Sequence, residues 1–316
     1  MSLLYRATAR RSLLAVIGVT AMVAAACASD DDAAGPEPGG RSSVSQETFT
    51  IGAIPDQDPE KLQRLYGTVA TYLSGQLGVK VEYKPVTDYP ASINLFRSGD
   101  LDLVWFGGLT GVQARLQVEG AQAIVQRDID EAFHSVFIAN TASGIRPVDA
   151  VGGLAQLKGK RFTYGSESST SGRLMPEYFL DQAGVRSGDF SGPPGFSGSH
   201  DKTIALVESG TFEVGALNEQ VWKSRTEAGQ VDQSKVSLIF RTPTYHDYHW
   251  VLGSSAASRY GPGFVDKVSQ AFLDLDGADP ADKEILDLFG AKRFIKTDNG
   301  NYRQIEEVGR KAGLIS

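Results

Sequence analysis

From residue 49 onward, short runs of apolar residues alternate with longer segments in which apolar residues recur every three or four positions. The short runs are typical of buried β-strands, and the longer spacing is typical of amphipathic helices. The clearest helix is predicted for residues 59–77, and Gly78 ends it. Strands alternating with helices of these lengths predict an α/β fold with right-handed crossovers and largely parallel sheets.

The same patterns divide the rest of the chain into two lobes. Strands are expected at 49–54, 79–85, 101–106, 135–140, 160–165, 214–217, 239–241 and 250–252. Helices are expected at 59–77, 92–97, 171–183, 200–209, 263–275, 281–288 and 301–312. With chain crossings near 137–140 and 240–245, we expect lobe 1 at about 49–137 and 246–316 and lobe 2 at about 138–245. A ligand cleft is expected between the lobes, where strand ends and helix N-termini converge.

Charge and cysteine content exclude several classes of protein. The 316 residues carry 31 Lys+Arg against 38 Asp+Glu, a net charge of −7, which argues against a nucleic-acid partner. The single cysteine excludes a disulfide framework and a cysteine-rich metal site. Past the N-terminus no run reaches the 18 or more apolar residues of a membrane span, so the mature chain is not expected to cross a membrane.

The N-terminus carries an export signal. Arg6, Arg10 and Arg11 precede a stretch without charge up to residue 26, so residues 1–26 are predicted to be a signal peptide. Cys27 follows three alanines and resembles a lipobox cysteine, which becomes the lipid-modified first residue. Residues 27–48 are rich in Asp, Gly, Pro and Ser, and we expect this segment to be the lipidated cysteine followed by a flexible tether. The protein is therefore expected outside the cytoplasm, anchored to the membrane after general secretory or twin-arginine export.

The most informative chemistry lies in the segment YGSESSTSG, residues 164–172. It stands between a predicted strand and a predicted helix, and it places four hydroxyls in succession at Ser168, Ser169, Thr170 and Ser171. The first N–H groups of a helix lack partners, and the helix dipole adds positive charge there. One hydroxyl is enough for an N-cap, so four favour a cradle for a tetrahedral oxyanion.

Other candidate residues are weaker when taken alone. Tyr89 follows Asp88, Trp105 and Phe106 close a strand before two glycines, and His200 begins a predicted helix. The segment TPTYHDYHW, residues 242–250, gathers His246, Asp247 and His249. Their spacing matches no standard zinc site, so a polar hinge strand that lines the cleft is the preferred interpretation. Because no P-loop, nucleophile elbow or CxxC occurs, we expect no cofactor, no metal and no enzymatic activity.

Taken in order, several motifs resemble one family. They are AIPD, VTDYPASI, GDLDLVWFG, SSTSG, MPEYF, SGSHD, GALNE and TPTYHDYHW. Together they resemble the phosphate, phosphite and phosphonate substrate-binding proteins of ABC transporters, and within these the group labelled as selenate-binding proteins. The resemblance implies a two-lobed periplasmic-binding-protein fold that closes on its ligand and delivers it to a membrane permease. We also expect a monomer, with the lipid anchor at the outer face of the cytoplasmic membrane.

The resemblance also suggests roles for individual residues. By position, the oxyanion would be held by Tyr89, Ser169, Thr170, Ser171 and His200. Asn218 is retained and Asp247 matches a carboxylate that contacts the rest of the ligand, whereas Phe106 and Gln220 replace a family tyrosine and glutamate.

An ionised carboxylate repels a dianion, so Asp247 favours a ligand that carries a proton to donate to it, such as phosphite or a monoprotonated phosphonate. Selenate or selenite is the alternative ligand. A secreted hydrolase that uses His200 and Asp247 is the alternative of another class.

Overall fold

The structure is a computed structural model that describes residues 47–316. The expected signal peptide, Cys27 and most of the expected tether lie outside the described residues. The last two tether residues, Glu47 and Thr48, lie inside them. Arg259 donates from Nε to the Glu47 carboxylate (2.8 Å) and from Nη2 to the Thr48 carbonyl (3.4 Å), so Glu47 and Thr48, which the sequence assigned to the tether, contact the folded domain. Within the described part, no helix combines the length and apolar character needed to cross a bilayer.

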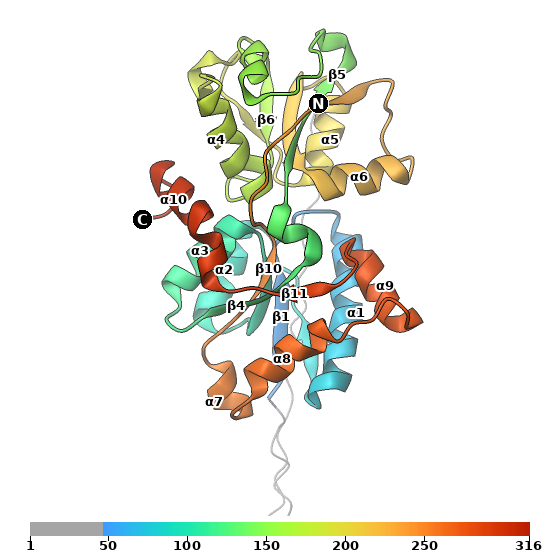
Figure 1. The fold of residues 1–316 in the computed structure, drawn as a ribbon, viewed down its shortest axis with the longest axis vertical. Coiled ribbons are helices and arrows are strands. Elements are labelled where there is room, and N and C mark those ends of the chain that lie inside the picture. Colours follow the sequence, from blue (N-terminus) through green and yellow to red (C-terminus); the bar gives the residue numbers. More distant parts are fainter. Residues whose placement is uncertain (1–46) are drawn as a thin grey trace, which may run out of the picture. The chain divides into compact units, whose positions relative to one another are not determined.

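Figure 1 shows the elements and their order. The strands are β1 Phe49–Ala53, β2 Val81–Tyr83, β3 Leu103–Phe106, β4 Gln122–Arg127, β5 Ser135–Asn140, β6 Phe162–Tyr164, β7 Gly195–Phe196, β8 Val214–Asn218, β9 Val236–Arg241, β10 His249–Leu252 and β11 Phe294–Lys296. The α-helices are α1 Pro59–Leu77, α2 Tyr89–Ser98, α3 Gly108–Gln117, α4 Met175–Gln182, α5 His200–Glu208, α6 Glu219–Glu227, α7 Ala256–Tyr260, α8 Phe264–Leu273, α9 Pro280–Phe289 and α10 Arg303–Lys311. Short 3₁₀ turns are η1 Asp128–Ala132, η2 Thr141–Ser143, η3 Val151–Leu157, η5 Ser187–Asp189 and η6 Asn299–Tyr302, and η4 Thr170–Leu174 is a π-helical turn.

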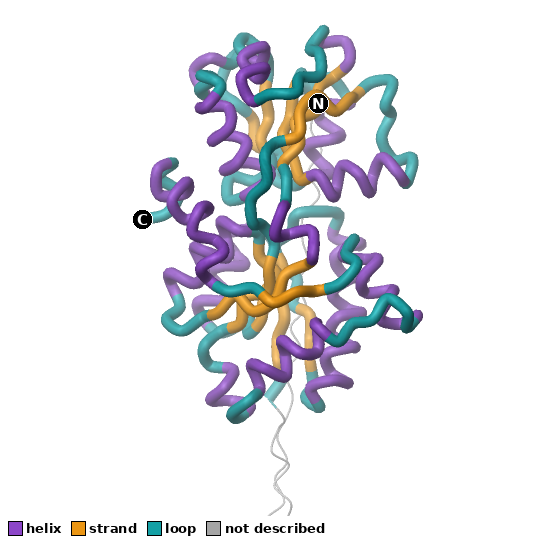
Figure 2. Tube along the Cα trace, in the orientation of Figure 1, coloured by secondary structure: helices purple, strands orange, loops and turns teal. Residues whose placement is uncertain are grey.

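The strands form two sheets, each with helices on both sides (Figure 2). The first sheet has the order β11-β4-β10-β3-β1-β2, and the second has the order β7-β6-β8-β5-β9. We call each sheet with its helices the first and the second lobe. The α/β class and the two-sheet arrangement predicted from the sequence are confirmed.

The prediction of largely parallel sheets holds only for part of each sheet. In the first lobe β2, β1 and β3 are parallel, whereas β10 and β11 run antiparallel to their neighbours. In the second lobe β7, β6 and β8 are parallel, whereas β5 is antiparallel to β8 and β9. For β5 and β10 the physical reason is that each is entered directly from the other lobe, so no helical crossover within one sheet sets its direction.

Two segments connect the lobes, residues 128–134 and 242–248. The first expected crossing, near 137–140, is wrong, because the apolar run from Ser135 already belongs to β5 of the second sheet. The two connecting segments also pair with each other. Phe133 and Tyr245 exchange two backbone hydrogen bonds (2.9 and 3.0 Å), and the Asp247 N–H donates to the Asp130 carbonyl (3.1 Å).

Helix α1 confirms its prediction from end to end. The Asp58 carboxylate accepts from the N–H groups of Glu60 and Lys61, a side-chain N-cap, and Gly78 takes the left-handed conformation (φ 71°) that closes the helix. Helix α2 begins three residues earlier than predicted, because Asp88 caps it. The patterns missed α3 and α6, since α3 is rich in glycine and only Val221 and Trp222 of α6 are buried.

Candidate functional site

The hydroxyl-rich segment lies where the two lobes meet. Ser169 is the N-cap of η4, and its Oγ accepts from the Gly172 N–H (2.9 Å), so this hydroxyl performs the capping role. Thr170 and Ser171 follow in the first turn and are buried. Ser168 is only partly buried, and its N–H donates weakly to Ser166 (3.4 Å). The four hydroxyls therefore divide into one cap, two buried groups and one group at the edge.

The start of α3, in the first lobe, points at this segment. Its N-cap residue is Gly107, which has no side chain to accept from the first N–H groups of the helix. Instead, the Gly108 N–H donates to Asp247 Oδ1 (2.9 Å), and the Leu109 N–H donates across the lobes to Thr170 Oγ1 (2.9 Å). A helix start of this kind carries positive dipole charge. A side chain at position 107 would crowd the site, since its Cβ would lie 3.1 Å from Thr170 Oγ1.

Three polar atoms at this place have no hydrogen-bond partner of good geometry among the described residues: Tyr89 Oη, Ser171 Oγ and Asp247 Oδ2. All three side chains are almost completely buried. Tyr89 lies close enough to Ser169 for that hydroxyl to oppose the rise that burial causes in the tyrosine pKa. Buried polar groups without partners are rare in folded proteins, so this cluster is built to meet a polar ligand.

Tyr248 organises the other half of the site. Its hydroxyl donates to Asp56 Oδ2 (2.8 Å) and accepts from Asn218 Nδ2 (3.0 Å). His200 Nε2 lies 3.2 Å from the same hydroxyl, and the Asn218 N–H donates to His200 Nδ1 (3.4 Å). This pairing makes Nε2 the protonated nitrogen, so His200 donates to Tyr248. The network joins residues of both lobes.

Burial controls the charge of the ionisable groups. It raises the pKa of Asp247 to about 7, although the hydrogen bond from Gly108 opposes the shift. It also raises the pKa of Asp56 to about 6, against the hydrogen bond from Tyr248. Burial lowers the pKa of His200 to about 4, so this imidazole is neutral at neutral pH. Near pH 7, Asp247 therefore changes easily between accepting and donating a hydrogen bond.

One buried cation stands behind the network. Arg127 donates from Nε and Nη2 to the Asp130 carboxylate (2.6 and 2.7 Å) and packs over the rings of Trp105 and Tyr248 (5.5 and 5.1 Å). Burial opposes its charge, but the neighbouring Asp130 raises its pKa, so it stays charged. Since Asp130 neutralises Arg127, the site as a whole has little positive charge to offer a dianion.

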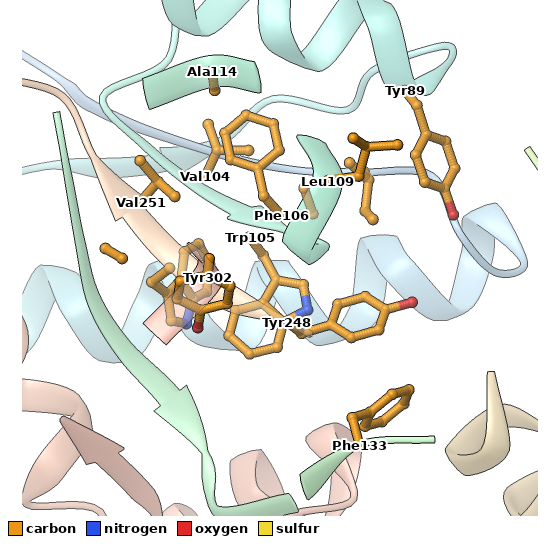
Figure 3. Packing of buried hydrophobic residues seen from close by; sticks show 14 of the residues in the cluster. Tyr89, Val104, Trp105, Phe106, Leu109, Ala114, Phe133, Tyr248, Val251 and Tyr302 are labelled. Atoms are coloured by element: carbon orange, nitrogen blue, oxygen red, sulfur yellow. The ribbon is translucent and has the colours of Figure 1, made fainter. Parts of the chain in front are cut away.

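The two aromatic residues at the end of β3 have different environments. Trp105 stacks on Tyr248 (5.8 Å between ring centroids), beside the network, whereas Phe106 meets Phe96 edge-on (5.7 Å). Figure 3 shows the Phe106 ring on the side of Val104 and the Trp105 ring beside Tyr248. Successive side chains of a strand point to opposite faces, which explains the difference. The structure thus does not bring the Phe106 ring to the hydroxyl cluster.

The side chains of the HDYH segment also diverge. Asp247 faces α3, His249 stacks on Tyr302 (3.7 Å), and His246 approaches Gln126 (3.4 Å). In the described range no group of three His, Cys, Asp or Glu side chains is arranged to hold a metal ion.

Two cavities lie near the meeting of the lobes. An inner cavity of about 10 Å³, lined by Asp56, Trp105, Arg127, Asn218 and Tyr248 among others, is roughly the size that one water needs. A much larger groove, about 670 Å³, lies between α4 and α10, away from the unpartnered atoms. The Tyr248 network lines the small cavity, whereas Tyr89, Ser171 and Asp247 do not. We place the site at these three unpartnered groups, beside the start of α3.

Sequence reasoning missed Tyr248, Asp56 and Arg127 as members of the site. Asp56 carried a usable signal, because it closely follows a strand of a parallel pair, at the sheet edge where ligands bind. Tyr248 adjoins Asp247, but the sequence alone does not say which aromatic residue of TYHDYHW faces the cleft. Arg127 gave no signal, since its burial depends on Asp130 and three rings that meet only in the fold.

Comparison with known proteins adds independent findings. Residues 51–302 match the family described as the phosphonate periplasmic substrate-binding protein of ABC transporters. A Prochlorococcus marinus protein, named as the probable ABC transporter phosphite binding protein PhnD1, is 50% identical over 270 residues, which are 85% of this chain and 91% of its own length. The phosphate-import protein PhnD of Mycolicibacterium smegmatis is 27% identical over 282 residues, 84% of this chain and 82% of its length.

A solved structure agrees with these sequence matches. The structure of PhnD1 from Prochlorococcus marinus in complex with methylphosphonate has a TM-score of 0.83 and 49% identity. The match covers 85% of this chain and 99% of that chain.

Proposed function

Because the chain belongs to the phosphonate family of periplasmic substrate-binding proteins of ABC transporters, we propose that it binds phosphite or a small phosphonate between its lobes. The observation that carries the proposal is the cluster of Tyr89 Oη, Ser171 Oγ and Asp247 Oδ2, buried and unpartnered beside the start of α3. Two hydroxyls can donate to the oxygens of the ligand, and the helix start adds positive potential.

The charges support a ligand that is itself protonated. Asp247 and Asp56 are buried carboxylates, and the positive charge of Arg127 is balanced by Asp130. A monoanion that carries an acidic proton can donate to ionised Asp247, whereas a dianion is repelled by it.

We extend the proposal to the place of the protein in the cell. Cys27 would be lipidated and would anchor the mature chain at the outer face of the cytoplasmic membrane, where it would deliver its ligand to a permease. Family membership supports an extracytoplasmic transport role. Replacement of Cys27 by Ser should release the protein from the membrane fraction, and incorporation of labelled fatty acid should be lost with it.

Isothermal titration calorimetry of the purified protein tests the ligand assignment. The ligands are phosphite, methylphosphonate, phosphate, selenate, selenite and sulfate. We expect phosphite or methylphosphonate to bind most tightly, and Ser171→Ala to weaken that binding by about 1–3 kcal/mol. Ser209→Ala removes an exposed hydroxyl at the C-terminal end of α5, outside the site, and this control should bind as the wild type does.

The alternatives give different results in the same experiment. Tight binding of selenate or selenite with weak binding of phosphite would favour the selenate interpretation and refute the phosphonate proposal. Steady release of phosphate from a phosphate ester, measured in the same preparation, would favour a hydrolase. Equal affinity of wild type and Ser171→Ala for the best ligand would refute the site.

A further inference from the structure

Two helix starts from different lobes face each other at the edge of the site. Helix α1 belongs to the first lobe and α5 to the second. The Asp58 N–H, at the start of α1, donates to Asp201 Oδ2 on α5 (2.8 Å). In the other direction, the His200 N–H, at the start of α5, donates to the Asp56 carbonyl just before α1 (2.9 Å). We call these two hydrogen bonds the interlobe clasp.

The clasp satisfies backbone groups that a single lobe leaves open. The first N–H groups of a helix have no partner inside the helix. The Ser199 side chain caps α5 at Lys202, so the His200 N–H depends on the Asp56 carbonyl of the other lobe. Because both bonds of the clasp cross between lobes, they form only when the lobes approach. A contact made in only one conformation shifts the equilibrium toward that conformation.

Asp201 is held in the orientation that the clasp requires. Arg225 donates to both of its carboxylate oxygens, from Nε and Nη2 (2.8 Å each). Gln230 in turn accepts from Arg225 Nη1 (2.6 Å). A bidentate pair of this kind fixes the plane of the carboxylate before the lobes meet. Since Arg225 and Asp201 are both in the second lobe, this pair survives opening, and only the bond to Asp58 is broken.

We infer that Asp201 is a positioning residue for ligand binding, which stabilises the closed arrangement of the lobes without touching the ligand. The ligand part of this inference rests on the proposed function, whereas the closing role rests on the hydrogen bonds of the clasp. Its contribution is the same for every ligand that fits the closed site. Loss of the Asp201 carboxylate therefore raises the rate of ligand dissociation and leaves the ratio of affinities between two ligands unchanged.

The sign of the effect separates this role from a purely electrostatic one. The Asp201 carboxylate lies next to His200 and carries negative charge near an anion site. If Asp201 acted only through its charge, its removal would strengthen the binding of an anion. The clasp requires the opposite result, which is weaker binding.

The experiment compares wild type, Asp201→Ala and Glu213→Ala by stopped-flow tryptophan fluorescence with methylphosphonate and with phosphite. Glu213 is the matched control, because its side chain is 24% exposed against 22% for Asp201. It also accepts a backbone N–H and pairs with basic side chains, but Lys160 and Arg161 are in its own lobe. Asp201→Ala should dissociate about tenfold faster for both ligands, which is about 1.4 kcal/mol. Glu213→Ala should match the wild type.

Small-angle X-ray scattering of the ligand-free proteins gives a second readout that needs no ligand. Asp201→Ala should have a larger radius of gyration than wild type and Glu213→Ala, because its lobes separate more. Asp201→Asn keeps a side-chain oxygen that can accept from the Asp58 N–H. Its dissociation rate and its radius of gyration should therefore lie between those of wild type and Asp201→Ala. Unchanged dissociation together with unchanged scattering would overturn the clasp, as would a change in the ratio of affinities. If the wild type binds neither ligand, the proposed function fails and scattering alone decides the clasp.

Discussion

Replacing Asp247 by Asn should make the protein more stable at alkaline pH, although it removes a carboxylate from a hydrogen bond. Asp247 is fully buried, and burial raises its pKa from the ordinary 3.8 to about 7. Each pKa unit corresponds to about 1.4 kcal/mol, so the ionised side chain costs about 4 kcal/mol of folding free energy above pH 7. Asparagine has a similar shape and stays neutral at every pH.

The direction of the pH dependence follows from proton binding. Between pH 4 and pH 7 the folded chain keeps a proton on Asp247 that the unfolded chain has already lost. Unfolding therefore releases a proton, and the free energy of unfolding falls as pH rises through this range. Between pH 5 and pH 8, the titration of Asp247 lowers the free energy of unfolding by roughly 2–3 kcal/mol. Asp247→Asn has no carboxyl group at this position to titrate, so its free energy of unfolding should exceed that of wild type by roughly 2–3 kcal/mol more at pH 8 than at pH 5.

Urea unfolding of ligand-free wild type and Asp247→Asn at pH 5, 6, 7 and 8 measures this difference directly. Asp56, whose pKa burial raises to about 6, titrates in both proteins and largely cancels in the comparison. A difference between the two proteins that is the same at pH 5 and pH 8 would refute the argument, because it would mean that Asp247 ionises normally in the folded chain. In the same pH series, methylphosphonate binding by wild type should weaken above pH 7 more than binding by the variant.

Three further outcomes follow from the packing of the site and of the first lobe. Ser171→Ala and Tyr89→Phe should leave the midpoint of thermal unfolding nearly unchanged, because neither hydroxyl makes a hydrogen bond of good geometry within the protein. Calorimetry should nevertheless find ligand binding weaker by about 1–3 kcal/mol, and a drop in stability with full binding would contradict the assignment. Gly111→Ala should lower the free energy of unfolding, measured with urea, by about 1–3 kcal/mol, because the new Cβ would lie 2.4 Å from the His249 ring. An unchanged free energy would show that the ring moves away freely. Gly107→Ala should weaken the binding of methylphosphonate and of phosphite in calorimetry, because its Cβ would press on the Thr170 hydroxyl of the opposite lobe. The far-UV circular dichroism spectrum should stay unchanged. Unaltered affinity would place that contact outside the closed site.

Elements whose pattern is local were predicted well from the sequence. Helix α1 has a capping aspartate, a regular apolar face and a terminal glycine, and all three signals lie within the helix or directly next to it. The hydroxyls at 168–171 were recognised for the same reason, since capping physics acts on consecutive residues. Their division into a cap, two buried groups and an edge residue depended on the opposite lobe, which the sequence does not show.

Features that depend on contacts between distant segments could not be predicted. The direction of β5 and β10 is set by the connections between lobes, and no local pattern records it. The burial of Arg127 depends on Asp130 and on rings from three segments. Phe106 could be placed on a strand, but which face of the sheet it occupies depends on the register, and a shift of one residue reverses the answer.

The pairing of the two connecting segments has a consequence for motion. Two independent linkers would allow the lobes to twist and slide as well as bend. Here Phe133 and Tyr245 are joined by two backbone hydrogen bonds, and Asp247 is bonded to the carbonyl of Asp130 in the same ribbon. The linkers must therefore deform together, which reduces the movement to bending about one axis. Since Asp247 is itself part of this ribbon, its carboxylate moves with the hinge. If Asp247 contacts the ligand as proposed, the position of the hinge depends on whether the site is occupied.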